Sequence, residues 1–189
     1  MAELVFNFSV MGGGKTTQLL LNEYNETQRG KKVIIIKPAV DTRDGNFHGW
    51  GRIKSRVIVG THKALYIEKV IPEDYALFDT IYVDEAQFFK YDDIYALTEI
   101  VDKYGIDVIC YGLKTNCEGH LFEGSEALLA LADRCNEIQK ICKCGRLSNM
   151  HIRYIDGKIA EDQKGISVEK GNITYDSLCR QCWKKALNK

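Results

Sequence analysis

The sequence predicts an α/β fold, in which a mostly parallel sheet is covered by helices on both faces and a small second unit follows. Short apolar runs rich in β-branched residues alternate with segments whose apolar residues recur at helical spacing, the pattern of parallel βαβ units. A glycine-rich turn follows the first run, and two close cysteine pairs stand near the C-terminal end. We therefore expect one unit over residues 1–141 and a second over residues 142–189.

The expected strands are short runs of apolar residues. A continuous apolar run is typical of a strand that is buried on both of its faces. In chain order these runs cover residues 4–8, 33–37, 80–84 and 108–111, and a weaker run covers residues 137–141. After residue 142 we expect shorter strands, because turn signals stand close together there, at Asp156–Gly157 and at Gly171–Asn172.

Three helices are expected between these strands. The first covers residues 16–28 and stops near Gly30, and the second contains the helically spaced apolar residues between 94 and 104. The third covers residues 125–133, with Ser125 as its candidate N-cap. The polar, glycine-dotted stretch over residues 41–57 is interpreted as a loop or flap, and loops of that length are usually functional.

The composition is that of an ordinary globular protein and excludes a largely disordered chain. Hydrophobic residues make up 45% and charged residues 28%, and 26 basic residues balance 26 acidic ones. A net charge of zero gives no reason to expect a nucleic-acid partner. No apolar run reaches the length that spans a bilayer, and residues 1–10 do not resemble a signal peptide. We expect a cytoplasmic protein without a membrane partner.

The seven cysteines favour a metal site over a disulfide framework, because their number is odd and no secretory signal accompanies them. Cys110, Cys117 and Cys135 are scattered and are interpreted as small hydrophobic or surface residues. The other four form two close pairs separated by residues 145–178, and four thiolates suit a closed tetrahedral zinc site. C-x-C is tighter than the usual C-x-x-C, and two unlinked pairs of free thiols are the alternative. The four candidate ligands are Cys142, Cys144, Cys179 and Cys182.

The glycine-rich turn fits the phosphate loop G-x-x-x-x-G-K-[ST], with a serine in place of the first glycine. Glycines let backbone N–H groups surround phosphates, the lysine reaches the β- and γ-phosphates, and the hydroxyl of the last residue binds Mg²⁺. A small residue with negative φ can make the same first turn. A strand before the turn and a helix after it strengthen the assignment. The loop consists of Ser9, Val10, Met11, Gly12, Gly13, Gly14, Lys15 and Thr16.

Two carboxylates, Asp84 and Glu85, end the expected strand at residues 80–84. The carboxyl ends of parallel strands line the ligand crevice of an open sheet. Asp84 is therefore placed to hold Mg²⁺, and Glu85 to accept a proton. An exposed acidic loop is the alternative interpretation.

Taken together, these motifs resemble the small, zinc-containing, cytosolic thymidine kinases over nearly the whole chain. The resemblance is carried by the two cysteine pairs and by residues 11–16, 37–43, 83–88, 111–113 and 121–125. It implies transfer of the γ-phosphoryl group of ATP to the 5′-hydroxyl of thymidine, which gives dTMP in pyrimidine salvage for DNA synthesis. It also implies a RecA-like P-loop core, a zinc-bound lasso, Mg²⁺ as a cofactor and a homotetramer.

The resemblance also implies roles for individual residues. Glu85 would be the general base, and Thr16 and Asp84 would serve magnesium. ATP would be bound by the loop and by Asp84, Glu85, Ala86 and Gln87. The nucleoside would be contacted by Asp41, Arg43, Leu113, Cys117, Phe122, Ile166, Ser167, Val168, Glu169, Lys170 and Tyr175.

Two departures from the family pattern bear on the choice of base. Cys117 stands where the family usually has an aromatic residue, and Glu169-Lys170-Gly171 replaces the usual Ile-Gly-Gly. A kinase of the same fold with a broader choice of deoxynucleosides is therefore an open alternative. More distant alternatives are a zinc-ribbon ATPase that acts on DNA, disfavoured by the neutral charge, and a non-catalytic nucleotide switch, disfavoured by the adjacent Asp84 and Glu85.

Overall fold

The computed structural model describes residues 1–40, 49–53, 55, 62–160 and 172–188. They form a seven-stranded sheet of order β3-β4-β2-β5-β6-β1-β7 and a three-stranded sheet of order β10-β8-β9. The strands of the larger sheet are β1 (Leu4–Ser9), β2 (Val33–Pro38), β3 (Gly49–Ile53), β4 (His62–Ile67), β5 (Thr80–Val83), β6 (Asp107–Leu113) and β7 (Arg134–Glu137). Neighbouring strands of this sheet are parallel apart from β3, which pairs with β4 in the antiparallel sense.

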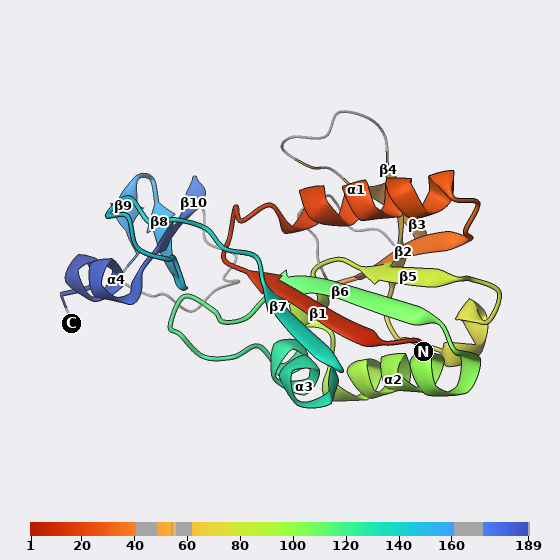
Figure 1. The fold of residues 1–189 in the computed structure, drawn as a ribbon. Coiled ribbons are helices and arrows are strands. Elements are labelled where there is room, and N and C mark those ends of the chain that lie inside the picture. The colour runs from red at the N-terminus through yellow and green to blue at the C-terminus, as the bar shows by residue number, and fades with distance from the viewer. Residues whose placement is uncertain (41–48, 54, 56–61, 161–171, 189) are drawn as a thin grey trace.

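Helices cover both faces of the large sheet, as the sequence predicts. Helix α1 (Lys15–Gln28) lies on one face, and α2 (Tyr91–Tyr104) and α3 (Glu123–Leu131) lie on the other (Figure 1). Two short 3₁₀ helices, η2 (Pro72–Tyr75) and η3 (Ala86–Phe88), flank β5. The α/β fold with a mostly parallel sheet is confirmed.

Each face of the sheet has its own hydrophobic core. On the α1 face, Leu19 and Leu20 pack with Ile35, Tyr82 and Tyr111 of the strands. On the other face, the apolar side of α2 and residues of α3 pack against alternate residues of the central strands. Burying both faces explains why the central strands appear in the sequence as continuous apolar runs.

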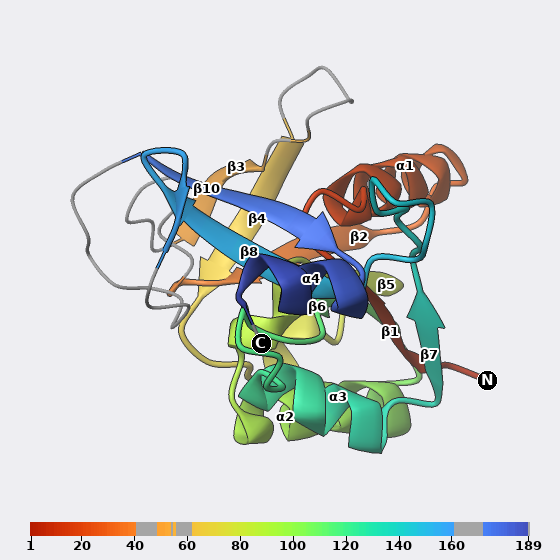
Figure 2. The ribbon, with the colours of Figure 1, turned by 90° about the vertical axis from the view of Figure 1, so that its left-hand side faces the viewer.

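The small unit contains β8 (Met150–Ile155), β9 (Lys158–Ile159), β10 (Ile173–Leu178) and α4 (Arg180–Ala186). It lies beyond the carboxyl ends of the main strands, and Figure 2 views the molecule from that side. The expected turn at Asp156–Gly157 connects β8 to β9, with φ of 50° and 78°. The other expected turn includes Gly171, which lies outside the described residues.

The interpretation of residues 41–57 as a loop is wrong for Gly49–Ile53, which forms β3 and pairs with β4. The alternation that marks a strand is hidden there because Gly51 replaces an apolar side chain. A Cβ atom on Gly51 would lie 2.6 Å from the ring of Tyr66, so the ring occupies the space of a side chain. Residues 41–48, 54 and 56–57 of the stretch lie outside the described residues.

Two further boundaries differ from expectation. The strand expected at residues 137–141 is instead β7, Arg134–Glu137, and all four of its residues are exposed, so no apolar run marks it. Helix α3 begins at Glu123 with Phe122 at its N-cap, not at Ser125. Ser125 is fully buried and its hydroxyl donates a hydrogen bond of 2.6 Å to the carbonyl oxygen of Leu113, so it fastens α3 to β6.

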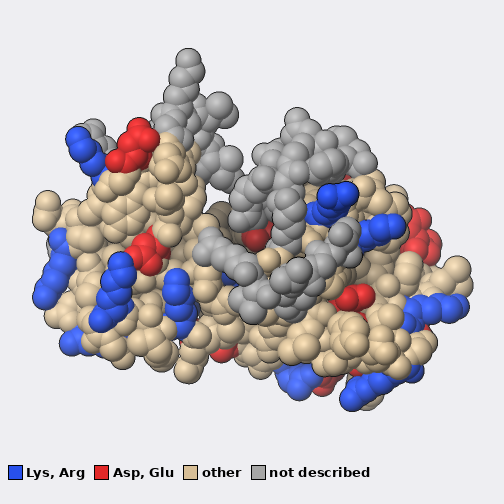
Figure 3. Space-filling model, turned by 90° about the horizontal axis from the view of Figure 1, so that it is seen from above, with Lys and Arg blue, Asp and Glu red and all other residues tan. Residues whose placement is uncertain are grey.

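The exposed charges are mixed in sign. Viewed from above, basic and acidic side chains are both visible over the small unit and over the main sheet (Figure 3). Among the described residues, no helix is long and apolar enough to cross a membrane.

Candidate active site and metal cluster

The candidate site lies at the carboxyl edge of the main sheet. Strand β6 separates β1 from β5, and the ends of β1, β2, β5 and β6 meet at this edge. The phosphate loop follows β1, Asp84 follows β5 and Leu113 ends β6. This is the edge at which open α/β sheets bind ligands.

The phosphate loop makes a tight turn that depends on its glycines. Gly12 and Gly14 have φ of 68° and 84°, a region that other residues rarely adopt. A Cβ atom on Gly13 would lie 2.0 Å from the hydroxyl oxygen of Ser9. Ser9 is not among the described non-glycine residues with positive φ, so a serine satisfies the turn at the first position.

The loop presents positive groups toward the site. Lys15 is buried, and its ammonium group donates a hydrogen bond of 3.0 Å to the carbonyl oxygen of Val10. Helix α1 starts at this residue, and the N–H groups of a first helical turn have no helical acceptors and attract anions. The N–H groups of Met11 and Gly13 are used within the protein, since they donate to His151 Nδ1 at 3.4 Å and to the Val10 carbonyl at 3.2 Å.

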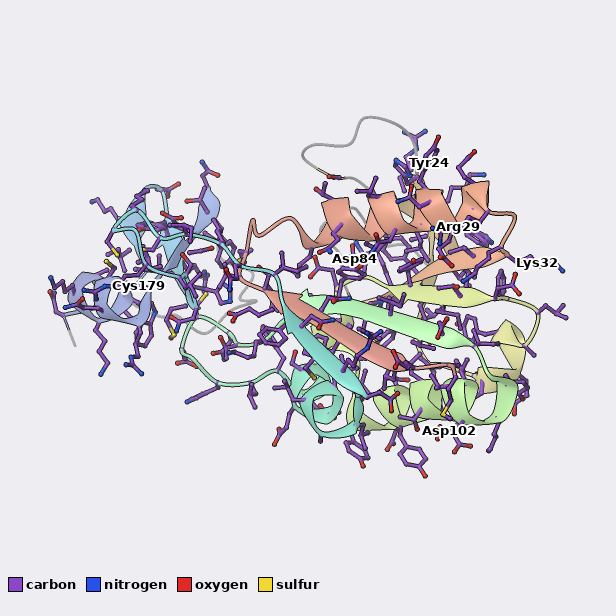
Figure 4. The ribbon with its side chains drawn as sticks, viewed as in Figure 1. Tyr24, Arg29, Lys32, Asp84, Asp102 and Cys179 are labelled. Atoms are coloured by element: carbon purple, nitrogen blue, oxygen red, sulfur yellow. The ribbon has the colours of Figure 1, made fainter. Side chains whose placement is uncertain are left out.

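Asp84, directly after β5, contacts residues of α1 and of β2. Its carboxylate accepts a hydrogen bond from the Thr16 hydroxyl at 3.4 Å and lies 3.8 Å from the Lys37 ammonium. In Figure 4 Asp84 lies beneath α1 at the edge of the sheet. Asp84 and Lys37 are both nearly fully buried. The carboxylate and hydroxyl oxygens are the hard donors that Mg²⁺ prefers, so this pair fits the ion.

Glu85 has an unusual backbone conformation. Its φ of 55° and ψ of 37° are left-handed, which is strained for a residue with a side chain. Its carboxylate accepts a hydrogen bond of 2.6 Å from the Gln87 amide nitrogen, and the amide oxygen of Gln87 accepts one of 3.0 Å from the Leu113 N–H. A Cβ atom on Gly112 would lie 2.9 Å from that amide oxygen. Gln87 thus holds the carboxyl group against the end of β6.

The expected nucleoside residues are only partly brought together. The Phe122 ring packs edge to face against Phe88 of η3, with centroids 5.7 Å apart. Cys117 is buried, and burial raises the pKa of its thiol to about 11, while the charge of Arg153 acts in the opposite direction. Tyr175 of β10 is partly exposed and lies opposite Arg153 in the pairing of β10 with β8. The remaining expected nucleoside residues, Asp41, Arg43 and residues 166–170, lie outside the described residues.

The four paired cysteines converge in the small unit. The Sγ atoms of Cys142, Cys144, Cys179 and Cys182 all lie within 4.8 Å of one another, and those of Cys144 and Cys179 are 3.5 Å apart. Zn–S bonds of about 2.3 Å in a tetrahedron place sulfurs about 3.8 Å apart, so the cluster fits zinc. Cys179 is labelled in Figure 4.

Local backbone structure explains how a C-x-C pair reaches the cluster. The Gly145 N–H donates to the Cys142 carbonyl at 2.8 Å, and the Cys142 N–H donates to the Arg146 carbonyl at 2.7 Å. Gly145, with φ of 85°, completes this tight turn. Cys179 is the N-cap of α4 and Cys182 lies in its first turn. A turn and a helix start therefore face each other with two sulfurs each.

The cluster favours thiolate formation at two of its sulfurs. Backbone N–H groups of Cys144 and Cys179 lower the pKa of Cys142 to about 6, and a backbone hydrogen bond from Cys182 lowers the pKa of Cys179. Hydrogen bonds to its neighbours raise the pKa of Cys182 to about 12. The thiolate is the form that binds metal.

Four residues at the site were missed by the sequence analysis. Lys37 could have been found, because a lysine at the end of an apolar run lies at the ligand edge of a parallel sheet. Lys140, His151 and Ser177 contact Met11 of the phosphate loop and come from distant parts of the chain. No local pattern in the sequence points to them.

Comparisons of the sequence with known proteins give one family over nearly the whole chain. A family model described as thymidine kinase matches residues 2–183. The thymidine kinase of Vibrio vulnificus (strain CMCP6) is 39% identical over 197 residues, which cover 100% of both chains. The thymidine kinase of Enterobacteria phage T4 is 35% identical over 202 residues, covering 100% of this chain and 99% of that one. A Bacteroides Pif1 crystal structure bound to single-stranded DNA aligns with a TM-score of 0.33 and 18% identity, over 70% of this chain and 33% of that one, which is too weak a likeness to support any argument.

Proposed function

This chain belongs to the thymidine kinase family, and from that premise we propose which of its residues carry out the transfer of the ATP γ-phosphoryl group to the 5′-hydroxyl of thymidine. The observation that carries the proposal is the meeting of Thr16, Asp84 and Lys37 beside the phosphate loop, with Glu85 next in the chain. Phosphoryl transfer depends on positioning and on neutralising charge, and this edge of the sheet supplies groups for both.

The phosphate loop is proposed to hold the triphosphate. The Lys15 ammonium would leave the Val10 carbonyl and bind the β- and γ-phosphates, while N–H groups at the start of α1 receive phosphate oxygens. Thr16 and Asp84 would hold Mg²⁺, which supplies further charge neutralisation at the phosphates. Ala86 and Gln87 are included in the nucleotide site because they form η3 directly after Glu85.

Glu85 is proposed as the general base. The Gln87 amide nitrogen donates a hydrogen bond to the Glu85 Oε2 atom and so holds the carboxylate at the end of β6, where it would meet the sugar hydroxyl. The carboxylate would orient that hydroxyl toward the γ-phosphorus and take its proton late in the transfer. The strained backbone fixes where the carboxyl group points, and such strain is common at functional sites.

The nucleoside is proposed to bind between the end of β6 and the small unit. Leu113, Cys117, Phe122 and Tyr175 would contribute there, together with Asp41, Arg43 and residues 166–170. A thiol at position 117 offers no ring to stack on a base, so a kinase with a broader choice of deoxynucleosides is the alternative at this site.

Zinc is proposed to occupy the four-cysteine cluster as a structural ion. Four protein ligands leave no open position for substrate, so the metal would hold the fold of the small unit together. We propose a boundary between units at residues 141 and 142, which falls between the two sheets. Reduced cysteines favour the cytoplasm as the location of the protein.

A homotetramer is proposed from the family resemblance. The exposed edge strand β7 is a feature of this chain that suits association, because an open edge presents unpaired backbone groups. Light scattering coupled to gel filtration tests the state: a mass of one chain would contradict the tetramer.

The activity is tested by incubating the protein with Mg-ATP and a panel of nucleosides, and by identifying the product. Thymidine should yield dTMP with the highest kcat/KM. Comparable values for several deoxynucleosides would favour the broader kinase. ATP hydrolysis that depends on DNA and not on a nucleoside would favour the DNA-handling ATPase.

A further inference from the structure

The backbone of one residue of the phosphate loop, Met11, is held by three side chains from the C-terminal part of the chain. The carbonyl oxygen of Met11 accepts hydrogen bonds from the Ser177 hydroxyl at 2.6 Å and from the Lys140 ammonium at 3.1 Å. The N–H of the same residue donates to His151 Nδ1 at 3.4 Å. Lys140 also donates to the Ser177 hydroxyl at 3.2 Å, so the three side chains form one network.

Two of the three side chains in the network are shielded from water. His151 is 2% and Ser177 3% exposed, and Lys140 is half-buried. A backbone N–H can donate to Nδ1 only where that nitrogen carries no proton, so the imidazole is neutral with its proton on Nε2. Burial, followed by the charges of Lys15 and Lys140, lowers the pKa of His151 to about 4 and keeps it neutral near pH 7.

Met11 stands next to the residues that would hold the phosphates. Because the N–H and the carbonyl of Met11 are both engaged, the two peptide units that flank this residue can rotate only if these hydrogen bonds break. Gly12 and Gly14 follow with left-handed backbone angles and can change conformation easily. Fixing the two peptide units around Met11 therefore fixes the start of the glycine-rich part of the loop.

We propose that His151 and Ser177 are positioning residues for the phosphate loop, through which the small unit sets the loop conformation that binds ATP. The inference rests on the proposed role of the loop in ATP binding. It assigns the strands β8 and β10 a task beyond the nucleoside site, because they carry these two side chains.

The cysteine cluster would control the same network. Ser177 stands two residues before Cys179, and β10 pairs with β8 so that Ser177 lies opposite His151. A cluster held by metal would therefore fix the positions of the Ser177 and His151 side chains relative to Met11. Loss of the metal should weaken ATP binding as well as loosen the small unit.

The test compares two buried serines of the small unit. Ser177→Ala removes the hydroxyl that binds Met11, whereas Ser148→Ala removes an equally buried hydroxyl that donates only to the Ser177 carbonyl at 3.4 Å. Binding of the non-hydrolysable β,γ-imido analogue of ATP with Mg²⁺ is measured by calorimetry, without nucleoside. We expect Ser177→Ala to raise the Kd roughly 3- to 10-fold, the range for one lost hydrogen bond, and Ser148→Ala to leave it within about twofold.

His151 is tested by substitution and rescue. Asn at position 151 offers an acceptor oxygen close to the place of Nδ1, whereas Leu offers none. We expect His151→Leu to raise the Kd for the analogue and His151→Asn to restore most of the affinity. Equal effects of Asn and Leu would overturn the positioning role. Should His151→Leu fail to fold, the two serine variants still decide.

The outcome separates this inference from the proposed site. Lys15→Ala should abolish binding of the analogue, and unchanged binding would remove the loop from the ATP site altogether. If Lys15→Ala abolishes binding but Ser177→Ala equals Ser148→Ala, the loop binds ATP and the inference is wrong. Urea unfolding of each variant shows whether a change in Kd accompanies a change in global stability.

Discussion

Lys37 and Asp84 form an ion pair of 3.8 Å between neighbouring strands, with side chains only 4% and 2% exposed. The Lys37 ammonium also lies over the face of the Tyr66 ring, with its nitrogen 5.3 Å from the ring centroid. Few buried charges can be left without their partner, because removing one member of such a pair leaves the other in a poorly solvated place. Removing either partner alone should therefore destabilise the fold, and the pair also fixes the position of Asp84.

The first prediction is a double-mutant cycle on this pair. Lys37→Met or Asp84→Asn alone should lower the free energy of unfolding by about 3–5 kcal/mol, and the double variant should lose less than the sum. Urea unfolding measures all three. Lys103→Met removes an exposed ion pair with Glu99 and should cost far less than either change at the buried pair, because water screens exposed charges. Additive losses at Lys37 and Asp84 would show that the two charges are not coupled.

The second prediction concerns the proposed base. Glu85→Gln keeps the size of the side chain but cannot accept the proton of the sugar hydroxyl. We expect kcat to fall by ~10²–10⁴-fold while the Kd for the ATP analogue stays within about twofold. Steady-state kinetics with thymidine and calorimetry measure the two quantities. An unchanged kcat would remove Glu85 from this role.

The third prediction concerns the strained backbone at the same position. Only glycine adopts φ of 55° without cost, so Glu85→Gly should be more stable than Glu85→Ala by about 1 kcal/mol. Both variants lose the carboxylate, so the comparison isolates the backbone. At Glu126, an exposed residue inside α3, the order should reverse, with Gly less stable than Ala. Equal stabilities at position 85 would indicate an unstrained backbone.

The fourth prediction concerns the metal. Protein purified without chelator should contain about one zinc per chain, and Cys142→Ser or Cys182→Ser should lower that content sharply. Cys135→Ser is the control, because Cys135 is exposed and lies outside the cluster. Atomic absorption gives the content, and thermal unfolding should show a lower midpoint after chelation. Zinc-free protein with an unchanged midpoint would contradict a structural metal site.

The fifth prediction concerns pH. The pKa of His151 is about 4 in the folded protein and about 6.5 in an unfolded chain, so between these values the unfolded state binds more protons. Stability should therefore fall as the pH drops from about 6.5 toward 4, and the contribution of His151 is on the order of 3 kcal/mol. The groups facing this imidazole include the Lys15 and Lys140 ammonium groups, which stay charged over this range.

Urea unfolding at about pH 7 and about pH 4.5 measures this dependence. His151→Asn should lose about 2 kcal/mol less than the parent protein over that interval. His120→Asn, at an exposed histidine, should behave as the parent does. Acid also protonates the cysteine cluster, but it does so in all three proteins, so the differences report on His151. An identical pH dependence in the parent and His151→Asn would contradict a buried neutral imidazole.

Much of the main sheet could be predicted because its signals are local. The runs that became β1, β2, β5 and β6 are mostly apolar, since both faces of the sheet are covered. The phosphate loop and Asp84 follow directly from their places after β1 and β5. The cysteine cluster could be predicted because the four ligands stand in two close pairs.

The parts that escaped prediction depend on contacts between distant residues. Strand β7 has no apolar residue facing the core and is held by its pairing with β1 and by the hydrogen bond from Asn136 to Asn7. Strand β3 has a glycine where Tyr66 packs. The network around Met11 joins residues more than a hundred positions apart, and no periodicity in a sequence records such a contact.

The chain leaves the main sheet along a path that borders the phosphate loop. The Ile138 N–H donates to the Phe8 carbonyl at 2.8 Å, and the Ile138 carbonyl accepts from Ser9 at 2.5 Å. Lys140 then reaches Met11, so the spacing between positions 138 and 140 is set at both ends. A chimera that grafts the cysteine-bearing half of one relative onto the core of another should keep this tripeptide with its own core. An insertion between positions 138 and 140 would move Lys140 away from Met11. Such a hybrid should bind ATP poorly even if every cysteine and every catalytic side chain were retained.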